Sequence, residues 1–165
     1  TEIYTLSLHD ALPISWLLCE AAEALATAEN TDGADKTGIS EIQDIHGTAL
    51  RISSAAHEGL ADDGSLFYEK DGDAGYFDRD RHWWVQAEAV VGFLNAWQLS
   101  GDVSWLKMAS DAFNYISNNL VDRENGEWHW SIRADGTVNR DDDKAGFWKC
   151  PYHNTRMCLE ILSRQ

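Results

Sequence analysis

Apolar residues recur at steps of three and four along much of this 165-residue chain. Because an α-helix has 3.6 residues per turn, this spacing places the apolar side chains on one face of an amphipathic helix. We therefore expect an all-α fold in which such faces are buried between helices. The pattern is clearest between residues 42 and 60, where the face would carry Ile42, Ile45, Ala49, Ile52, Ala56 and Leu60.

Three further helices are predicted, over about residues 84–98, 103–120 and 151–162. Gly101 and Asp102 separate the first two, as a C-cap glycine and an N-cap aspartate would. The inward face of the first helix would carry Val90, Phe93, Leu94 and Trp97. The inward face of the second would carry Leu106, Ala109, Phe113, Ile116 and Leu120.

Two internal repeats indicate that the helices come in pairs. The pattern Trp-x-x-x-Glu-Ala occurs at residues 16–21 and again at 84–89, and the run at 63–68 resembles the run at 125–130. A repeated two-helix unit is typical of a barrel or solenoid of helix pairs rather than of an arbitrary bundle.

Short strands are expected between these pairs. Trp128 and Trp130 alternate with polar neighbours just before a turn at 134–137. Alternation with a period of two, followed by a turn that contains glycine, is typical of a hairpin. Such hairpins would line one rim of the helical array.

The composition excludes several classes of partner. With 44% hydrophobic and 25% charged residues and only two prolines, the chain can form one globular core. Its net charge of −15 argues against nucleic acid or an anionic membrane surface, since phosphate binding needs clustered cations. No apolar run approaches the roughly 20 residues that span a bilayer. A neutral ligand is compatible with all of these features.

Cysteine and histidine usage favours a reducing environment and no metal. Cys19, Cys150 and Cys158 form no Cys-x-x-Cys pair, and their odd number does not suggest a disulfide framework. We therefore expect a cytoplasmic protein. The six histidines are scattered, and none forms a His-Glu-x-x-His arrangement, so no metal site is expected.

The segment 146–156 carries the strongest chemical signal. Pro151 favours the first turn of a helix, which places His153 near the helix N-terminus, where the helix dipole favours the neutral imidazole. Trp148 would lie in the preceding loop and could face the same cavity. A flat apolar ring beside a base suits a sugar site. A purely structural interpretation, with Trp148 in the core and His153 as a capping or filling residue, remains open on these residues alone.

Residues 84–89 (Trp-Val-Gln-Ala-Glu-Ala) and 144–154 (Lys-Ala-Gly-Phe-Trp-Lys-Cys-Pro-Tyr-His-Asn) resemble the C-terminal part of cellobiose 2-epimerases, a branch of the N-acylglucosamine 2-epimerase superfamily. The resemblance runs from about Trp16 to the last residue. It implies the C-terminal part of an (α/α)6 barrel and no cofactor. It also implies His153 as a proton-transferring residue, Trp84 and Trp148 as aromatic platforms for the sugar, and Glu88 as a supporting carboxylate.

The resemblance further implies that the C2 epimers of a β-1,4-linked reducing disaccharide are interconverted. A base removes the acidic C2 proton, and the resulting enediolate is reprotonated on its opposite face, which needs two bases. Three alternatives stay open: an aldose-ketose isomerase or N-acylglucosamine 2-epimerase acting on a monosaccharide, a non-catalytic sugar-binding remnant, and a glycoside hydrolase using Glu20 and Glu88.

Residues 1–15 do not fit this pattern. They resemble translated sequencing-adapter read-through, which leaves residues 16–165 as a partial barrel domain. The family carries His-Asp-x-Glu just before the tryptophan at position 16. Here the histidine and glutamate positions hold Asp10 and Pro13, and His9 is out of register by one residue.

Two expectations follow from this mismatch. The second catalytic histidine is unmatched, so the chain alone should be inactive. Pro13 would lie inside a helix, where it costs roughly 3 kcal/mol. Both ends of a partial barrel should also expose apolar surface and promote self-association.

Overall fold

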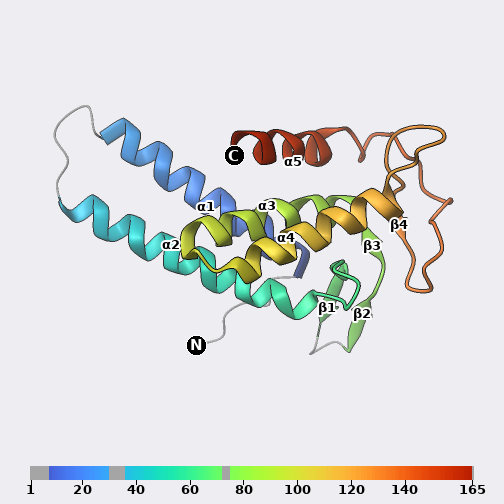
Figure 1. The fold of residues 1–165 in the computed structure, drawn as a ribbon, viewed down its shortest axis with the longest axis horizontal. Coiled ribbons are helices and arrows are strands. Elements are labelled where there is room, and N and C mark those ends of the chain that lie inside the picture. Colours follow the sequence, from blue (N-terminus) through green and yellow to red (C-terminus); the bar gives the residue numbers. More distant parts are fainter. Residues whose placement is uncertain (1–7, 30–35, 72–74, 165) are drawn as a thin grey trace.

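The structure, a computed structural model, describes residues 8–29, 36–71 and 75–164. Helices dominate the described residues, which confirms the predicted all-α class (Figure 1). The α-helices are α1 (Leu8–Glu29), α2 (Lys36–Ala56), α3 (Trp83–Ser100), α4 (Val103–Tyr115) and α5 (Tyr152–Ser163). The strands are β1 (Glu69–Asp71), β2 (Tyr76–Asp78), β3 (Arg81–His82) and β4 (Ser131–Ile132).

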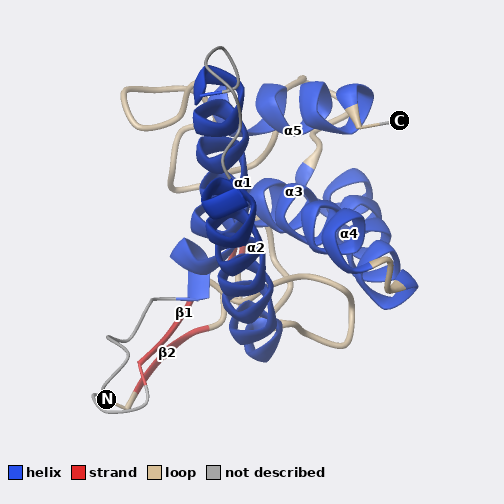
Figure 2. Cartoon of the chain, turned by 90° about the vertical axis from the view of Figure 1, so that its left-hand side faces the viewer, coloured by secondary structure: helices blue, strands red, loops and turns tan. Residues whose placement is uncertain are grey.

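The helices pack as two layers built from pairs. α1 packs against α2 and α3 packs against α4, while α3 also contacts both α1 and α5. α1, α3 and α5 run in the same direction, and their N-terminal ends point toward the end of the molecule that carries the strands (Figures 1 and 2). This arrangement brings Trp16 of α1, Glu88 of α3 and His153 of α5 close together.

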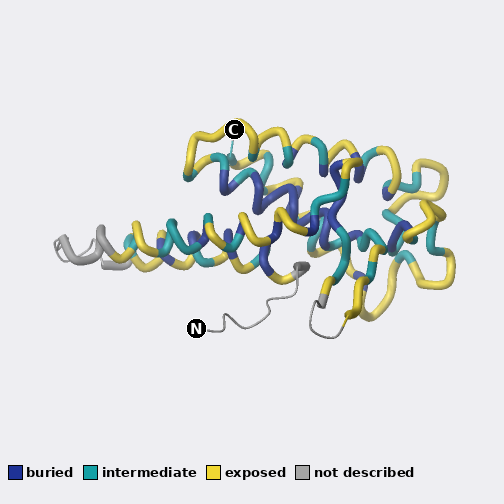
Figure 3. The backbone as a smooth tube through the Cα atoms, turned by 90° about the horizontal axis from the view of Figure 1, so that it is seen from below, coloured by how far each residue is buried: buried dark blue, intermediate teal, exposed yellow. Residues whose placement is uncertain are grey.

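Helix α3 forms the centre of the core. Twelve of its 18 residues are buried, in keeping with a sequence that is apolar almost all round the helix. Buried positions gather in the middle of the molecule, and exposed positions lie on its outside and in the loops (Figure 3). Gly92 permits a close approach of α1, because a Cβ atom there would lie 2.7 Å from Cδ2 of Leu12.

The predicted helix boundaries are close to those observed. Gly101 ends α3 with φ 71°, and Oδ1 of Asp102 accepts a hydrogen bond of 2.9 Å from the backbone N–H of Ser104, so both caps are confirmed. Pro151 is the N-cap of α5. In α2, Ala49 and Ala56 are fully buried, and the predicted isoleucines are partly buried.

The predicted inward face of α4 is partly wrong. Leu106 and Phe113 are exposed, while Trp105 stacks on Phe93 at 5.8 Å between ring centroids and Ala112 is fully buried. The large Trp105 ring occupies the groove beside α3, and this turns the helix so that the neighbouring residue faces outward. A π-helical turn, Ile116–Leu120, then extends α4 and buries both of its end residues.

The repeat of short loop segments is visible at the rim. Leu60 bridges Leu66 and Val121 bridges Trp128, each by antiparallel pairing across a loop that contains a glycine with positive φ. In the second of these segments, regular strand structure begins only at Ser131, where β4 pairs with β3 and Ile132 also bridges Val138 across the following turn. The predicted turn at 134–137 is present, and Gly136 adopts φ 85° within it.

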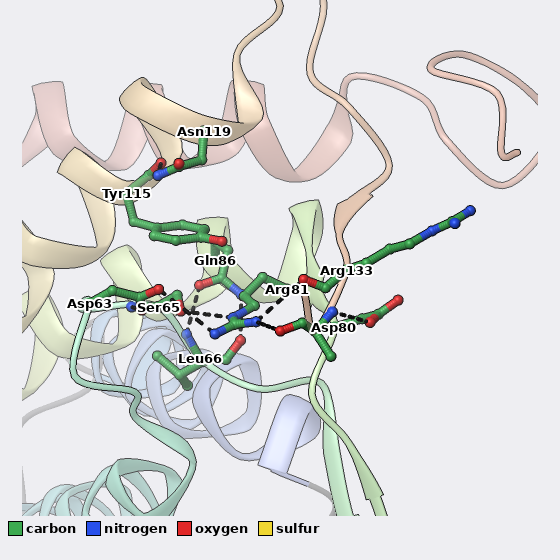
Figure 4. Close-up of polar contacts among 10 residues, drawn as sticks. Asp63, Ser65, Leu66, Asp80, Arg81, Gln86, Tyr115, Asn119 and Arg133 are labelled. Atoms are coloured by element: carbon green, nitrogen blue, oxygen red, sulfur yellow. Dashed lines mark hydrogen bonds and ion pairs between the residues drawn. The ribbon is translucent and has the colours of Figure 1, made fainter. Parts of the chain in front are cut away.

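Polar contacts fasten these rim segments to α3 (Figure 4). The Gln86 side chain is buried and bonds both backbone groups of Leu66, at 2.8 Å each. The Arg81 guanidinium donates to Oγ of Ser65 at 3.3 Å and to the carbonyl of Arg133 at 3.4 Å. The rim is therefore held in a fixed position over the start of α3.

Both outer parts of the array expose apolar side chains, as expected for a partial barrel. Leu17 and Leu25 on α1 and Leu159 and Leu162 on α5 are exposed. Pro13 lies inside α1, which confirms its predicted place in a helix. In the described part of the chain, no helix is long and apolar enough to cross a membrane.

Candidate functional site

The candidate site is built on a three-residue hydrogen-bonded chain. Nδ1 of His153 on α5 lies 2.6 Å from Oε1 of Glu88 on α3. The indole Nε1–H of Trp16 on α1 donates to Oε2 of the same carboxylate at 2.8 Å. Trp16 and Glu88 are buried, and His153 is partly exposed. Both oxygens of a buried carboxylate are therefore satisfied, and one of its partners reaches toward solvent.

Local structure explains why these groups meet. α5 begins directly after the Pro151 cap, and His153 is its second residue. Glu88 lies in the second turn of α3. Since α3 packs against both α1 and α5, the Glu88 side chain can reach Trp16 on one helix and His153 on the other. The expected position of His153 near a helix N-terminus is confirmed.

The geometry determines which imidazole nitrogen is available. An ionised carboxylate only accepts hydrogen bonds, so Nδ1 must carry a proton when Glu88 is charged. In the neutral ring, Nε2 then holds the free lone pair. Glu88 thus orients the ring and stabilises the positive charge that forms when Nε2 accepts a proton.

Aromatic rings surround His153 on several sides. Its ring centroid lies 5.5 Å from that of Trp84, with an interplanar angle of 38°. It lies 5.4 Å from the ring centroid of Trp83 and 4.9 Å from that of Tyr152, both in edge-on arrangements. Tyr68 meets Trp84 edge-on at 6.2 Å. The structure therefore brings the predicted platform residue Trp84 and the predicted base His153 together.

Trp148 does not join this group. Its side chain is 83% exposed, and its ring packs edge-on against Phe147, which is 90% exposed. Neither the expected cavity position nor a place in the core is observed. The loop before α5 extends from the rim, so five residues of sequence separation from His153 do not produce proximity.

Lys149, in contrast, is buried. Its Nζ donates to the carbonyl of Trp128, lies 5.0 Å from the centre of the Trp83 ring and 3.9 Å from Oε1 of Glu127. Burial lowers the pKa of the Lys149 ammonium group from 10.5 to about 8, and the nearby Glu127 carboxylate opposes this shift.

No role in the site was predicted from the sequence for Trp16, Trp83 or Lys149. The repeat of Trp-x-x-x-Glu-Ala marked Trp16 as the counterpart of Trp84, and this was a usable signal. Lys149 stood inside the quoted C-terminal motif, but a lysine in an irregular loop is normally solvated. Its burial follows from contacts that only the folded chain reveals.

The two carboxylates of the glycoside hydrolase alternative have different partners. Glu88 contacts His153 at the start of α5, whereas Oε1 of Glu20 lies 3.7 Å from Arg164 at its end. Glu88 is thus paired with the proposed base and Glu20 with a cation, at opposite ends of α5.

Metal binding and a second histidine are two further possibilities for this site. Across residues 8–29, 36–71 and 75–164, no three His, Cys, Asp or Glu side chains are grouped closely enough to hold a metal ion. The out-of-register His9 lies in the first turn of α1, and its side chain is outside the described set. Asp10, at the family's histidine position, is exposed.

Comparison with known sequences gives a consistent result. The family described as N-acylglucosamine 2-epimerase matches residues 42–156, more than half of the chain. A cellobiose 2-epimerase from Bacteroides fragilis is 49% identical over 93% of this chain, and one from Ruminococcus albus is 38% identical over 94%. The chain spans only 36% and 37% of the lengths of these relatives.

Solved structures agree on the fold. A sugar epimerase from a ruminal bacterium matches with a TM-score of 0.81 at 34% identity, over 96% of this chain and 38% of the other. A cellobiose 2-epimerase from Bacillus thermoamylovorans matches with a TM-score of 0.77 at 35% identity, over 96% and 37% of the two chains. The described helices thus form part of an (α/α)6 barrel, as predicted.

Proposed function

Because this chain belongs to the N-acylglucosamine 2-epimerase family, we propose that it forms the C-terminal part of the active site of a sugar 2-epimerase. The observation that carries the proposal is the contact of 2.6 Å between Nδ1 of His153 and Oε1 of Glu88. A base oriented by a buried carboxylate beside an aromatic wall is suited to proton transfer on a sugar.

The proposed reaction begins with the open-chain sugar, whose aldehyde acidifies the C2 hydrogen. Nε2 of His153 accepts this proton while Glu88 stabilises the imidazolium through Nδ1–H. The electron pair left at C2 delocalises onto the carbonyl oxygen and forms an enediolate. A second acid/base group on the opposite face, in its protonated form, then gives its proton to C2 and inverts its configuration. His153 can serve as donor in the reverse direction.

Substrate positioning is assigned to the aromatic residues. Trp84 would present its ring to an apolar sugar face beside His153, and Trp148 would close over the substrate from the exposed loop. We propose a β-1,4-linked reducing disaccharide as the substrate, supported by relatives named cellobiose 2-epimerase. Stacking of this kind orients the C2 hydrogen toward the base.

A chimera tests the proposal. Residues 16–165 replace the matched region of the Bacteroides fragilis relative, and the protein is incubated with cellobiose in deuterated water. We expect deuterium at C2 of both the recovered sugar and an aldose product epimeric at C2. Accumulating ketose would indicate an aldose-ketose isomerase instead, and binding without exchange would indicate a sugar-binding remnant.

The role of His153 is tested in the same chimera. His153→Asn should lower the exchange rate roughly 10²–10⁴-fold, the usual contribution of a positioned acid or base. His57→Asn is the matched control, because His57 lies in the exposed turn after α2 and should leave the rate unchanged. Equal rates in the His153 variant and the control would disprove the assignment.

Two further proposals accompany this function. We place the reaction in the cytoplasm, supported by three free cysteines, two of them exposed. We also propose that residues 1–15 are an artefactual leader, supported by Pro13 inside α1. Sequencing the source DNA across the junction of Ser15 and Trp16 should show His-x-x-Glu ending three residues before Trp16. Reads that encode Pro13 at this position would refute the proposal that residues 1–15 are an artefact.

A further inference from the structure

We propose that Lys149 and Glu127 form a clamp that positions His153 against Glu88. The inference rests on the proposed role of His153 as the proton-transferring residue. The two residues act through the chain on either side of His153, so they are positioning residues rather than catalytic ones. They belong to different rim segments, and together they fix the first turn of α5.

Lys149 anchors the chain before His153. Its side chain is 1% exposed, and its Nζ meets the Trp128 carbonyl on the opposite rim segment. The backbone of Lys149 forms a two-way bridge with Gly146, with N···O distances of 3.0 and 3.2 Å. These contacts offset part of the loss of hydration, and moving the side chain would leave a buried ammonium group without them, so this residue is held in place.

Glu127 anchors the chain on both sides of His153. Its Oε1 accepts a hydrogen bond of 3.1 Å from Nδ2 of Asn154 and lies 3.9 Å from Nζ of Lys149. Among the described residues, Glu127 alone adopts a positive φ, 63°, without being glycine. Local strain of this kind persists when surrounding contacts require it, and here it accompanies a carboxylate that contacts Lys149 before His153 and Asn154 after it.

Trp83 links the clamp to the imidazole. Lys149 Nζ lies over the Trp83 ring at 5.0 Å from its centroid, and that centroid lies 5.4 Å from the centroid of the His153 ring in an edge-on arrangement. The Trp83 ring is itself buried at the start of α3, one turn before Glu88. Lys149 therefore contacts the first turn of α3, and Glu88, the partner of His153, lies in the next turn; this connects the rim to the His153–Glu88 geometry.

The test measures the imidazole of His153 directly in the 165-residue chain, without any sugar. NMR on histidine-labelled protein follows the Nδ1 proton, which gives a persistent resonance while it is held against Glu88. The His153→Asn spectrum assigns the signal. Lys149→Met should broaden or abolish it, and Lys149→Arg, which keeps a cation over Trp83, should retain most of it. Lys107→Met, at an exposed ion pair on α4, should leave it unchanged.

A second variant separates positioning from folding. Glu127→Gly removes the carboxylate but suits the positive φ at this position, so the protein should melt no lower than the parent chain. It should nevertheless weaken the His153 signal. An intact signal in folded Glu127→Gly and Lys149→Met proteins would overturn the clamp. If the chimera fails to epimerise while these signals change as expected, the clamp stands and the proposed function falls.

Discussion

Helices α3 and α5 both contribute to the candidate site, yet they are packed very differently. α3 contacts helices on several sides and buries twelve of its residues, including Glu88. α5 packs mainly on α3, and among its described residues only Met157 is buried. The carboxylate is therefore positioned by the core, whereas the imidazole is positioned by the contacts of a single helical turn.

This difference assigns separate tasks to the two helices. A fixed acceptor deep in the core can hold both Trp16 and His153 with little freedom of its own. A lightly packed helix can adjust the accessible side of the imidazole to a substrate, provided that its first turn is anchored. Stability should thus respond mainly to changes in α3, and site geometry to changes around the start of α5.

The largest effect is expected from Phe93→Ala. Phe93 is fully buried on α3 and stacks on Trp105, so truncation leaves a cavity between α3 and α4. The free energy of unfolding should fall by about 3–5 kcal/mol. Urea denaturation followed by circular dichroism measures the change. A loss below about 1 kcal/mol would show that α3 is not the centre of the core.

Glu88→Gln should have the next largest effect. The amide keeps the shape but cannot accept from both Trp16 and His153 as the carboxylate does, so a buried donor loses its partner. The expected destabilisation is about 1–3 kcal/mol. Glu124→Gln, at an exposed rim position, is the control and should melt like the parent chain. Equal melting of both variants would mean that the buried network contributes nothing to folding.

The helices of this fold could be predicted because each carries a local signal. Periodic apolar residues located α2 and α3, and the pair Gly101–Asp102 located the boundary before α4. The face of α4 was harder, because Leu106 and Trp105 are neighbours and both are apolar. Only the space beside Phe93 decides which of them turns inward.

The site was predictable only in part, because its contacts are remote in sequence. His153 and Glu88 are separated by 65 residues, and Trp16 and Glu88 by 72. Family resemblance supplied the residue types, but no local pattern encodes which oxygen meets which nitrogen. The exposed position of Trp148 and the burial of Lys149 depend on how one irregular loop crosses the rim.

Lys149 should make stability depend on pH in an alkaline window. Its pKa is lowered from 10.5 to about 8, so between these values the unfolded chain binds more protons than the folded chain. The free energy of unfolding contributed by this group therefore rises with pH from about 8 to 10.5. Cys19 acts in the opposite sense, because burial raises its thiol pKa above 9.0.

The difference between parent and variant isolates the lysine. Urea midpoints measured across this window should rise less steeply in Lys149→Met than in the parent chain. The exposed Lys107→Met variant should follow the parent. Parallel curves for the parent and Lys149→Met would show that the ammonium group is solvated in the folded chain, and the anchoring of α5 would then have to come from other contacts.

The smallest effect on stability is expected on the outer face of α5, at Leu159→Ser and Leu162→Ser. These side chains are 61% and 67% exposed, so each substitution should change the free energy of unfolding by less than about 0.5 kcal/mol. Their effect should instead appear in association, because an exposed apolar face favours contact between copies. Sedimentation velocity at increasing concentration should show self-association of the parent chain that the double variant reduces. If the parent chain instead sediments as a single monomeric species and melts cooperatively, the exposed face of α5 does not need a partner. The contrast between α5 and α3 would then concern packing density alone.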